Sequence, residues 1–150
     1  VEKTWQTICM YSVDKMIKES RRFGRQQPAL AGFVLAYCDD FQVEVKDFVF
    51  CMAFVVYQMF KRVCDVPEIP EEIIDNADEQ TFNSIEVLAS DNFLDELAKV
   101  PSMLKQRYVF GYVASALFEK DASVALTAEE QGMAFLILKT VIDCLDKVTA

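Results

Sequence analysis

The stretch CMAFVVYQMF, residues 51–60, decides the fold, because it carries no charge and only one strongly polar side chain, Gln58. An uninterrupted apolar run overlaps this stretch, from Phe48 to Tyr57, and is ten residues long. A membrane-spanning helix needs about 20 apolar residues. Charged residues flank this run on both sides. A helix that is apolar on every side is normally surrounded by other helices. We therefore predict a central core helix that does not cross a membrane, with one side left open as a groove as the alternative.

Working outward, six stretches have helical periodicity and none alternates convincingly with a period of two. The first ends at Gly24, and prolines open the second and the fifth. In TAEE, Thr127 and Glu130 have the spacing of a capping box that starts the sixth helix. We predict an all-α fold, a compact bundle of five to seven helices, from patterns at about residues 4–23, 28–38, 45–64, 70–90, 101–118 and 128–148.

The two halves of the chain resemble each other. LAGFVLA, starting at Leu30, resembles VFGYVAS, starting at Val109, and MAFVV, starting at Met52, resembles MAFLI, starting at Met133. These matches predict an internal duplicated helical hairpin. We expect a single helical domain, residues 1–150, with pseudo-repeats at about 4–64 and 82–148 and an acidic segment, 65–100, between them.

Gly32 and Gly111 occupy matching positions in these repeats, inside predicted helices. A glycine inside a helix costs about 1 kcal/mol relative to alanine. We therefore expect both glycines to let two helices approach each other closely.

The net charge of −9 is unevenly distributed. Residues 65–100 carry eleven acidic side chains and one basic side chain, whereas residues 1–64 carry nine basic and seven acidic ones. A nucleic-acid-binding protein needs a basic face that neutralises phosphates. The last two thirds of the chain do not supply one, so we expect no nucleic-acid partner.

One basic cluster, KMIKESRRFGR at residues 15–25, lies at the end of the first predicted helix. Cations at this end complement the helix dipole, which explains the cluster as a solvated last turn. The alternative is docking of an acidic partner, or of the chain's own acidic segment. That segment is itself either a solvated helix face or a docking surface for a basic partner.

The content of cysteine and histidine restricts chemistry and location. Five cysteines, spaced without a C-x-x-C pair, are typical of buried thiols in a reducing compartment. No histidine is present, which excludes Ser-His-Asp and Cys-His catalysis. The start of the chain has no secretory signal pattern. Because the sequence begins at Val1 rather than at an initiator methionine, this expectation covers only the residues given. We expect a cytoplasmic protein that is not an enzyme and uses no cofactor.

Two turns between predicted helices are rich in carboxylates, which bind hard cations such as Ca²⁺ or Mg²⁺. Neither turn has the glycine of the D-x-[DN]-x-[DN]-G calcium loop, and acids at helix starts also complement the dipole. We expect no metal site, and the candidate ligands for the alternative are Asp39, Asp40, Glu44, Asp121, Glu129 and Glu130.

The same turns, CDDFQVEVKD and EKDASVALTAEE, with the apolar helices beside them, resemble the tellurite-resistance family of small helical proteins. The resemblance covers about half of the chain, and the family's Asp-Gly step is missing from both turns. No site residue is assigned from it.

These observations favour a non-catalytic helical interaction or assembly module that binds a protein partner or forms a homodimer. One alternative is a helical bundle that binds a small apolar ligand between its hairpins. A less favoured alternative is a carboxylate-based metal-binding protein or enzyme. An interaction module predicts a large exposed apolar patch, whereas a ligand binder predicts an enclosed pocket of about 300–1,000 Å³.

Overall fold

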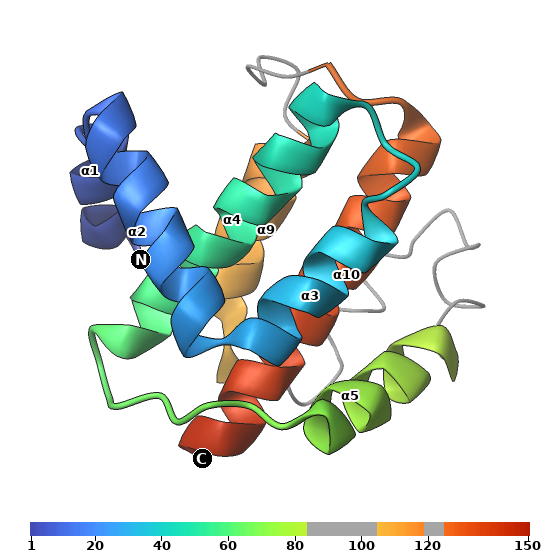
Figure 1. The fold of residues 1–150 in the computed structure, drawn as a ribbon. Helices are drawn as coiled ribbons and strands as arrows, with labels where there is room; N and C mark the ends of the chain where they lie inside the picture. The colour runs from blue at the N-terminus through green and yellow to red at the C-terminus, as the bar shows by residue number, and fades with distance from the viewer. Residues whose placement is uncertain (84–104, 119–124) are drawn as a thin grey trace.

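The computed structural model describes residues 1–83, 105–118 and 125–150, and all regular structure in these ranges is helical (Figure 1). The all-α prediction is confirmed, as is the compact bundle, because the described helices contact one another. The predicted end of the fourth helix near residue 90 and the predicted start of the fifth at Pro101 lie outside these ranges. The described helices are α1 (Glu2–Cys9), α2 (Val13–Gln26), α3 (Pro28–Tyr37), α4 (Val43–Lys61), α5 (Glu71–Asn83), α9 (Arg107–Phe118) and α10 (Ala128–Thr149).

The opening stretch forms the centre of α4 and is the most buried part of the chain's first half. All six residues from Met52 to Tyr57 are buried, and the side chain of Phe54 is fully inaccessible. Phe23 of α2 packs its ring 4.9 Å from that of Tyr57 and 6.1 Å from that of Phe54, measured between centroids. The prediction of a central core helix is confirmed.

The second central helix is α10, which packs against α4. Its start is the predicted capping box: the Thr127 hydroxyl accepts from the Glu130 N–H at 3.1 Å, and Glu130 Oε1 accepts from the Thr127 N–H at 2.9 Å. Ten of its residues are buried, including Phe135 and Leu138. Ala134, Phe135 and Ile137 of the MAFLI stretch are therefore core, as the likeness to MAFVV predicted, whereas Met133 is exposed.

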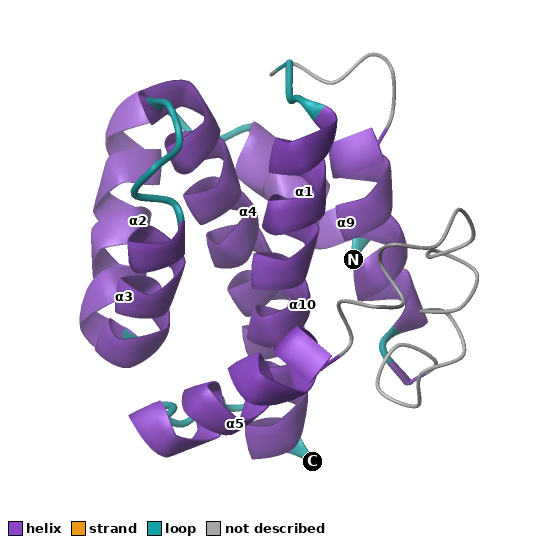
Figure 2. Cartoon of the chain, turned by 90° about the vertical axis from the view of Figure 1, so that its right-hand side faces the viewer, coloured by secondary structure: helices purple, strands orange, loops and turns teal. Residues whose placement is uncertain are grey.

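The remaining helices surround this pair. In Figure 2, α2 and α3 lie on one side of α4 and α10, and α9 lies on the other. Helix α1 packs against α4, and α5 packs along α10 and against α3. Because α3, α5 and α10 meet on one side of the molecule, that side is built from three segments far apart in sequence.

The buried Gln27 fixes the junction between α2 and α3. Its Nε2 donates to the Pro67 carbonyl and its Oε1 accepts from the Ile69 N–H, each at 2.9 Å. Both polar ends of a side chain that is only 1% exposed are thus satisfied. The connection between α4 and α5 is held against this junction, which sets where α5 begins.

The first predicted helix, residues 4–23, is wrong as a single element. It is two helices, α1 and α2, because Ser12 caps the second: its hydroxyl accepts from the Lys15 N–H at 3.2 Å. A serine side chain offers the backbone this bond at a helix start, and the chain breaks there. Gly24 does not end the second helix, which runs on to Gln26.

The expected close approach at Gly32 and Gly111 is also wrong. Both glycines are exposed, and a Cβ built on either would meet no atom within 4 Å. Neither glycine therefore brings two helices together. The internal duplication stays a prediction that rests on the sequence matches alone.

We predict that Gly32→Ala and Gly111→Ala each raise the free energy of unfolding by about 0.5–1 kcal/mol, because alanine restricts the unfolded chain and meets no neighbour in the helix. Urea denaturation followed by circular dichroism measures the change. Loss of stability at either position would show that the space beside it is occupied.

Among the described residues, no helix is both long enough and apolar enough to cross a membrane.

Candidate functional site

The candidate ligands for the alternative of a metal site come from two turns and do not form a cluster in the described ranges. Asp39, Asp40 and Glu44 are exposed around the turn between α3 and α4, and Asp39 pairs with Lys46 at 3.5 Å. Asp121 lies outside the described residues. Within the ranges that the structure describes, no three cysteine, aspartate or glutamate side chains gather as metal ligands would.

Glu129 and Glu130 lie in the first turn of α10. Glu129 is exposed, and Glu130 closes the capping box through its side chain. The carboxylate of Glu130 thus has a structural role at a helix N-terminus, where negative charge is favoured.

A largely apolar groove lies between α3, α5 and α10, with a volume of about 220 Å³. We call it the α3–α5–α10 groove. Asp78, Thr81 and Thr140 supply its polar lining. Its apolar lining comes from all three helices: Phe33, Tyr37, Phe82, Met133, Leu136 and Ile137.

Three of the large side chains around this groove are exposed to solvent. Phe82 is 70% exposed, Tyr37 is 45% exposed and Met133 is 38% exposed. Single exposed apolar residues are common on protein surfaces, but a cluster beside a hollow is typical of a binding surface. The sequence left a groove open as an alternative on the helix at residues 51–60; the α3–α5–α10 groove has no lining residue from that helix.

A short hydrogen bond ties α3 to α5 at the rim of the groove. The Tyr37 hydroxyl donates to Asp78 Oδ2 at 2.6 Å. The bond to Asp78, together with burial and the negative charge of Asp78, raises the pKa of Tyr37. The tyrosine therefore stays protonated at neutral pH and continues to donate this bond.

Beneath the groove, a buried polar network ties α5 to α10. Thr140 donates its hydroxyl to Thr81 at 2.9 Å, and Lys139 Nζ lies 3.4 Å from the same Thr81 oxygen. Lys139 also pairs with Asp143 Oδ2 at 2.7 Å, and the two side chains are only 4% and 10% exposed. Lys139 and Asp143 thus form a buried ion pair.

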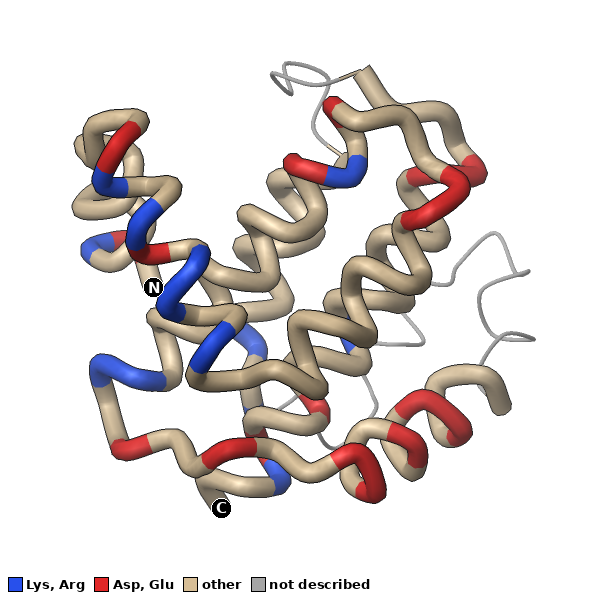
Figure 3. Tube along the Cα trace, in the orientation of Figure 1, with Lys and Arg blue, Asp and Glu red and all other residues tan. Residues whose placement is uncertain are grey.

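The charge around the groove is negative. Helix α5 has five acidic side chains, all between Glu71 and Glu79, and no basic one (Figure 3). Glu71, Asp75, Asp78 and Phe82 are spaced by four, three and four residues, which places them on one face of the helix. Helix α2, which packs on another side of α3, is predominantly basic (Figure 3).

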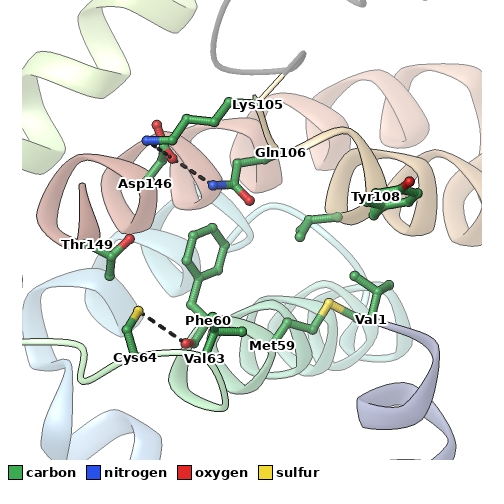
Figure 4. A pocket seen from close by; sticks show the side chains of 11 residues that line it. Val1, Met59, Phe60, Val63, Cys64, Lys105, Gln106, Tyr108, Asp146 and Thr149 are labelled. Carbon is green, nitrogen blue, oxygen red and sulfur yellow. Dashed lines mark hydrogen bonds and ion pairs between the residues drawn. The ribbon is translucent and has the colours of Figure 1, made fainter.

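A second pocket, of about 300 Å³, lies between the ends of α4, α9 and α10 (Figure 4). Met59, Phe60 and Val109 contribute apolar walls. On the opposite wall, Asp146 Oδ1 accepts from Lys105 at 3.1 Å and from Gln106 at 2.7 Å. We call this the Asp146 pocket.

Burial raises the pKa of several thiols and of one further tyrosine. Burial raises the pKa of Cys38 to about 11, against the opposing charge of Lys46, and burial raises the pKa of Cys144 to about 12. Burial also raises the pKa of Cys51 and Tyr112. Reactive thiols have lowered pKa values, so these groups stay protonated at neutral pH. All five cysteines are free thiols.

Comparison with known proteins gives no assignment. No protein-family model matches the chain, and neither the curated proteins nor the solved structures contain a match.

The groove was not predicted from the sequence, because it combines side chains from three distant helices. One signal for it was present: Phe82 lies in an acidic, polar stretch that has no other aromatic residue between Asp65 and Asn92. An isolated large aromatic among charges is a candidate contact residue, since aromatic side chains dominate interface energetics.

Proposed function

We propose that this protein is a non-catalytic interaction module that binds a partner protein at the α3–α5–α10 groove. The partner presents a helix with one large apolar side chain, which enters the groove, and basic side chains, which face α5. No chemistry takes place in this site, and its role is recognition.

The observation that carries the proposal is the cluster of exposed Phe82, Tyr37 and Met133 around an apolar hollow. Aromatic residues and methionine are enriched in the buried centres of protein interfaces, and a few such residues supply most of the binding energy. Methionine also adapts its shape to different partners. These three side chains therefore supply the apolar contact.

Charge supports a basic partner. Asp78 of α5 lines the groove, and the exposed Asp75 and Glu71 continue away from it along the same face of the helix. Complementary charges at an interface speed association and reject partners of the wrong sign. The same carboxylates repel phosphates, so the proposal assigns a protein partner rather than a nucleic acid.

The size of the groove supports a side chain as its occupant. Pockets for small ligands have volumes of about 300–1,000 Å³, whereas this groove measures about 220 Å³ and its rim is exposed. A hollow of this size accepts an anchoring side chain while the surrounding face binds the rest of the partner.

We also propose that the protein works in the cytoplasm. Five free thiols, two of them fully buried, fit a compartment that keeps cysteines reduced.

A selection from a display library of helical peptides tests the proposed function. We expect the enriched peptides to carry a large apolar residue flanked by lysine or arginine. We expect their affinity to fall at least about tenfold for the variant Phe82→Ser/Met133→Ser. Isothermal calorimetry measures the affinity at low and high salt, and binding weakens at high salt.

The control is Tyr108→Ser/Val63→Ser, which changes two exposed apolar side chains at the Asp146 pocket. This variant should bind the selected peptides as the unchanged protein does. A selection that enriches no peptide, or peptides that bind the groove variant unchanged, would contradict the proposal.

A second candidate function is binding of a small ligand in the Asp146 pocket. Its volume of about 300 Å³ reaches the lower limit for such sites, and its wall offers an ammonium group beside an amide (Figure 4). Native mass spectrometry of the protein as purified distinguishes the two candidates. A persistent extra mass that is lost in Tyr108→Ser/Val63→Ser would favour this pocket.

A further inference from the structure

We infer that the helix that enters the α3–α5–α10 groove is α2 of a second copy of this chain, so that copies associate head to tail. The inference rests on the proposed function, because it names the occupant of the same groove. It is carried by the fit in charge and spacing between the outer faces of α2 and α5.

The outer face of α2 has the properties of the required partner. The helix carries five basic and two acidic side chains. Ile17 is 46% exposed, and it borders a shallow hollow together with Lys18, Arg21 and Arg25. One exposed apolar residue is thus followed on the same face by basic residues. Asp14 lies at the other end of this face, away from the two arginines.

The spacing on α2 matches that on α5. Ile17, Arg21 and Arg25 repeat every four residues and span about 12 Å. On α5 the matching residues are read toward the N-terminus, as Phe82, then Asp78, then Asp75. These three positions span about 11 Å along the helix. When the two helices run antiparallel, Ile17 meets Phe82 and the groove.

The charged pairs follow from the same alignment. With Ile17 at the groove, Arg21 faces Asp78 and Arg25 faces Asp75. Asp78 keeps its bond from Tyr37 on one oxygen, Oδ2, and presents the other to the arginine. Arginine suits this contact, because its planar group donates to carboxylates in a fixed geometry.

One copy cannot place the outer face of its own α2 against the outer face of its own α5. Helices α2 and α5 run apart from the junction at Gln27, and α3 packs between them (Figures 1 and 3). The contact joins two different surfaces, so a row of copies keeps one free α2 at one end and one free α5 at the other, and further copies can add there. Because the face of one helix is small, association is transient and depends on protein concentration.

Sedimentation velocity of the full chain tests this assembly. We expect the mean mass to rise with concentration up to about 1 mM protein. We also expect the rise to be strongly reduced when salt increases from about 0.05 M to about 0.5 M. The variants Ile17→Ser/Arg25→Ser and Phe82→Ser/Asp75→Ser should each stay monomeric under the same conditions.

Mixing these two variants distinguishes head-to-tail contact from a symmetric dimer. The first variant keeps an intact groove and the second keeps an intact α2, so one contact forms between them. The expected product is a 1:1 heterodimer that grows no further. All four changed side chains are exposed, and circular dichroism confirms that both variants are folded.

A charge swap tests the alignment. Arg25→Glu and Asp75→Arg should each weaken association by about tenfold. One chain that carries both changes should associate as the unchanged protein does, because the pair is restored with reversed sign. Failure of this rescue, with both single variants folded, would overturn the antiparallel alignment.

Three results would overturn the inference: an unchanged protein that is monomeric throughout, variants that associate like the unchanged protein, or a mixture that forms no heterodimer. If the protein is monomeric and its α2 binds vesicles containing phosphatidylserine, α2 is a lipid contact instead. The proposed function is judged separately, because selected peptides that require Phe82 would still support the groove with a different partner.

Discussion

Replacing Phe54 by aspartate unfolds the protein. The side chain of Phe54 is fully inaccessible at the centre of α4. Its loss alone costs about 3–5 kcal/mol, and the aspartate adds an uncompensated charge or a protonated carboxyl without a partner. A domain of this size is stable by about 5–15 kcal/mol. The variant should therefore lack a cooperative melting transition in circular dichroism and should expose apolar surface.

The matched control is Phe82→Asp, which makes the same change at a side chain that is 70% exposed. Its free energy of unfolding should stay within about 0.5 kcal/mol of that of the unchanged protein. If Phe54→Asp melted cooperatively near the normal temperature, α4 would not be the core of the bundle.

The central helices could be predicted from sequence because their signal is local and redundant. Ten apolar residues in a row leave no polar face for solvent, and this decides burial without knowledge of the neighbours. The capping box at Thr127 is equally local, since both of its bonds join residues three apart. Such features do not depend on the rest of the fold.

The break between α1 and α2 was missed because Ser12 fits two patterns. It continues the apparent stripe of the predicted helix, and it is also an N-cap residue. The choice between them is decided by how α1 packs against α4, which the local pattern does not contain. The glycines were misinterpreted for a related reason, because helical spacing alone did not show that their side of the helix faces solvent.

The groove and its polar floor depend on contacts between distant segments. Thr81 and Thr140 lie 59 positions apart and meet through one hydrogen bond. Part of the floor was nevertheless visible in the sequence. Lys139 and Asp143 are four residues apart within a helix that is apolar around them, and such a pair is expected to be buried together.

This buried pair leads to the second large expected effect. Lys139→Met should lower the free energy of unfolding by about 3–5 kcal/mol, because it leaves the Asp143 carboxylate buried without its cation. Asp143 Oδ1 already has no hydrogen-bond partner among the described residues, so the carboxylate has little other compensation. Asp143→Leu should have a comparable effect, since it leaves the lysine ammonium buried.

The double variant Lys139→Met/Asp143→Leu should recover most of this loss and could exceed the unchanged protein by about 1–4 kcal/mol, because apolar side chains of similar size need no desolvation of charge. Urea denaturation of all four proteins gives the coupling energy of the pair. The control is Arg22→Met, which breaks the exposed Arg22–Glu19 pair and should cost less than about 1 kcal/mol. A double variant less stable than either single variant would mean that the pair is needed for its hydrogen bond to Thr81, and that the floor of the groove is held by polar contacts rather than by packing.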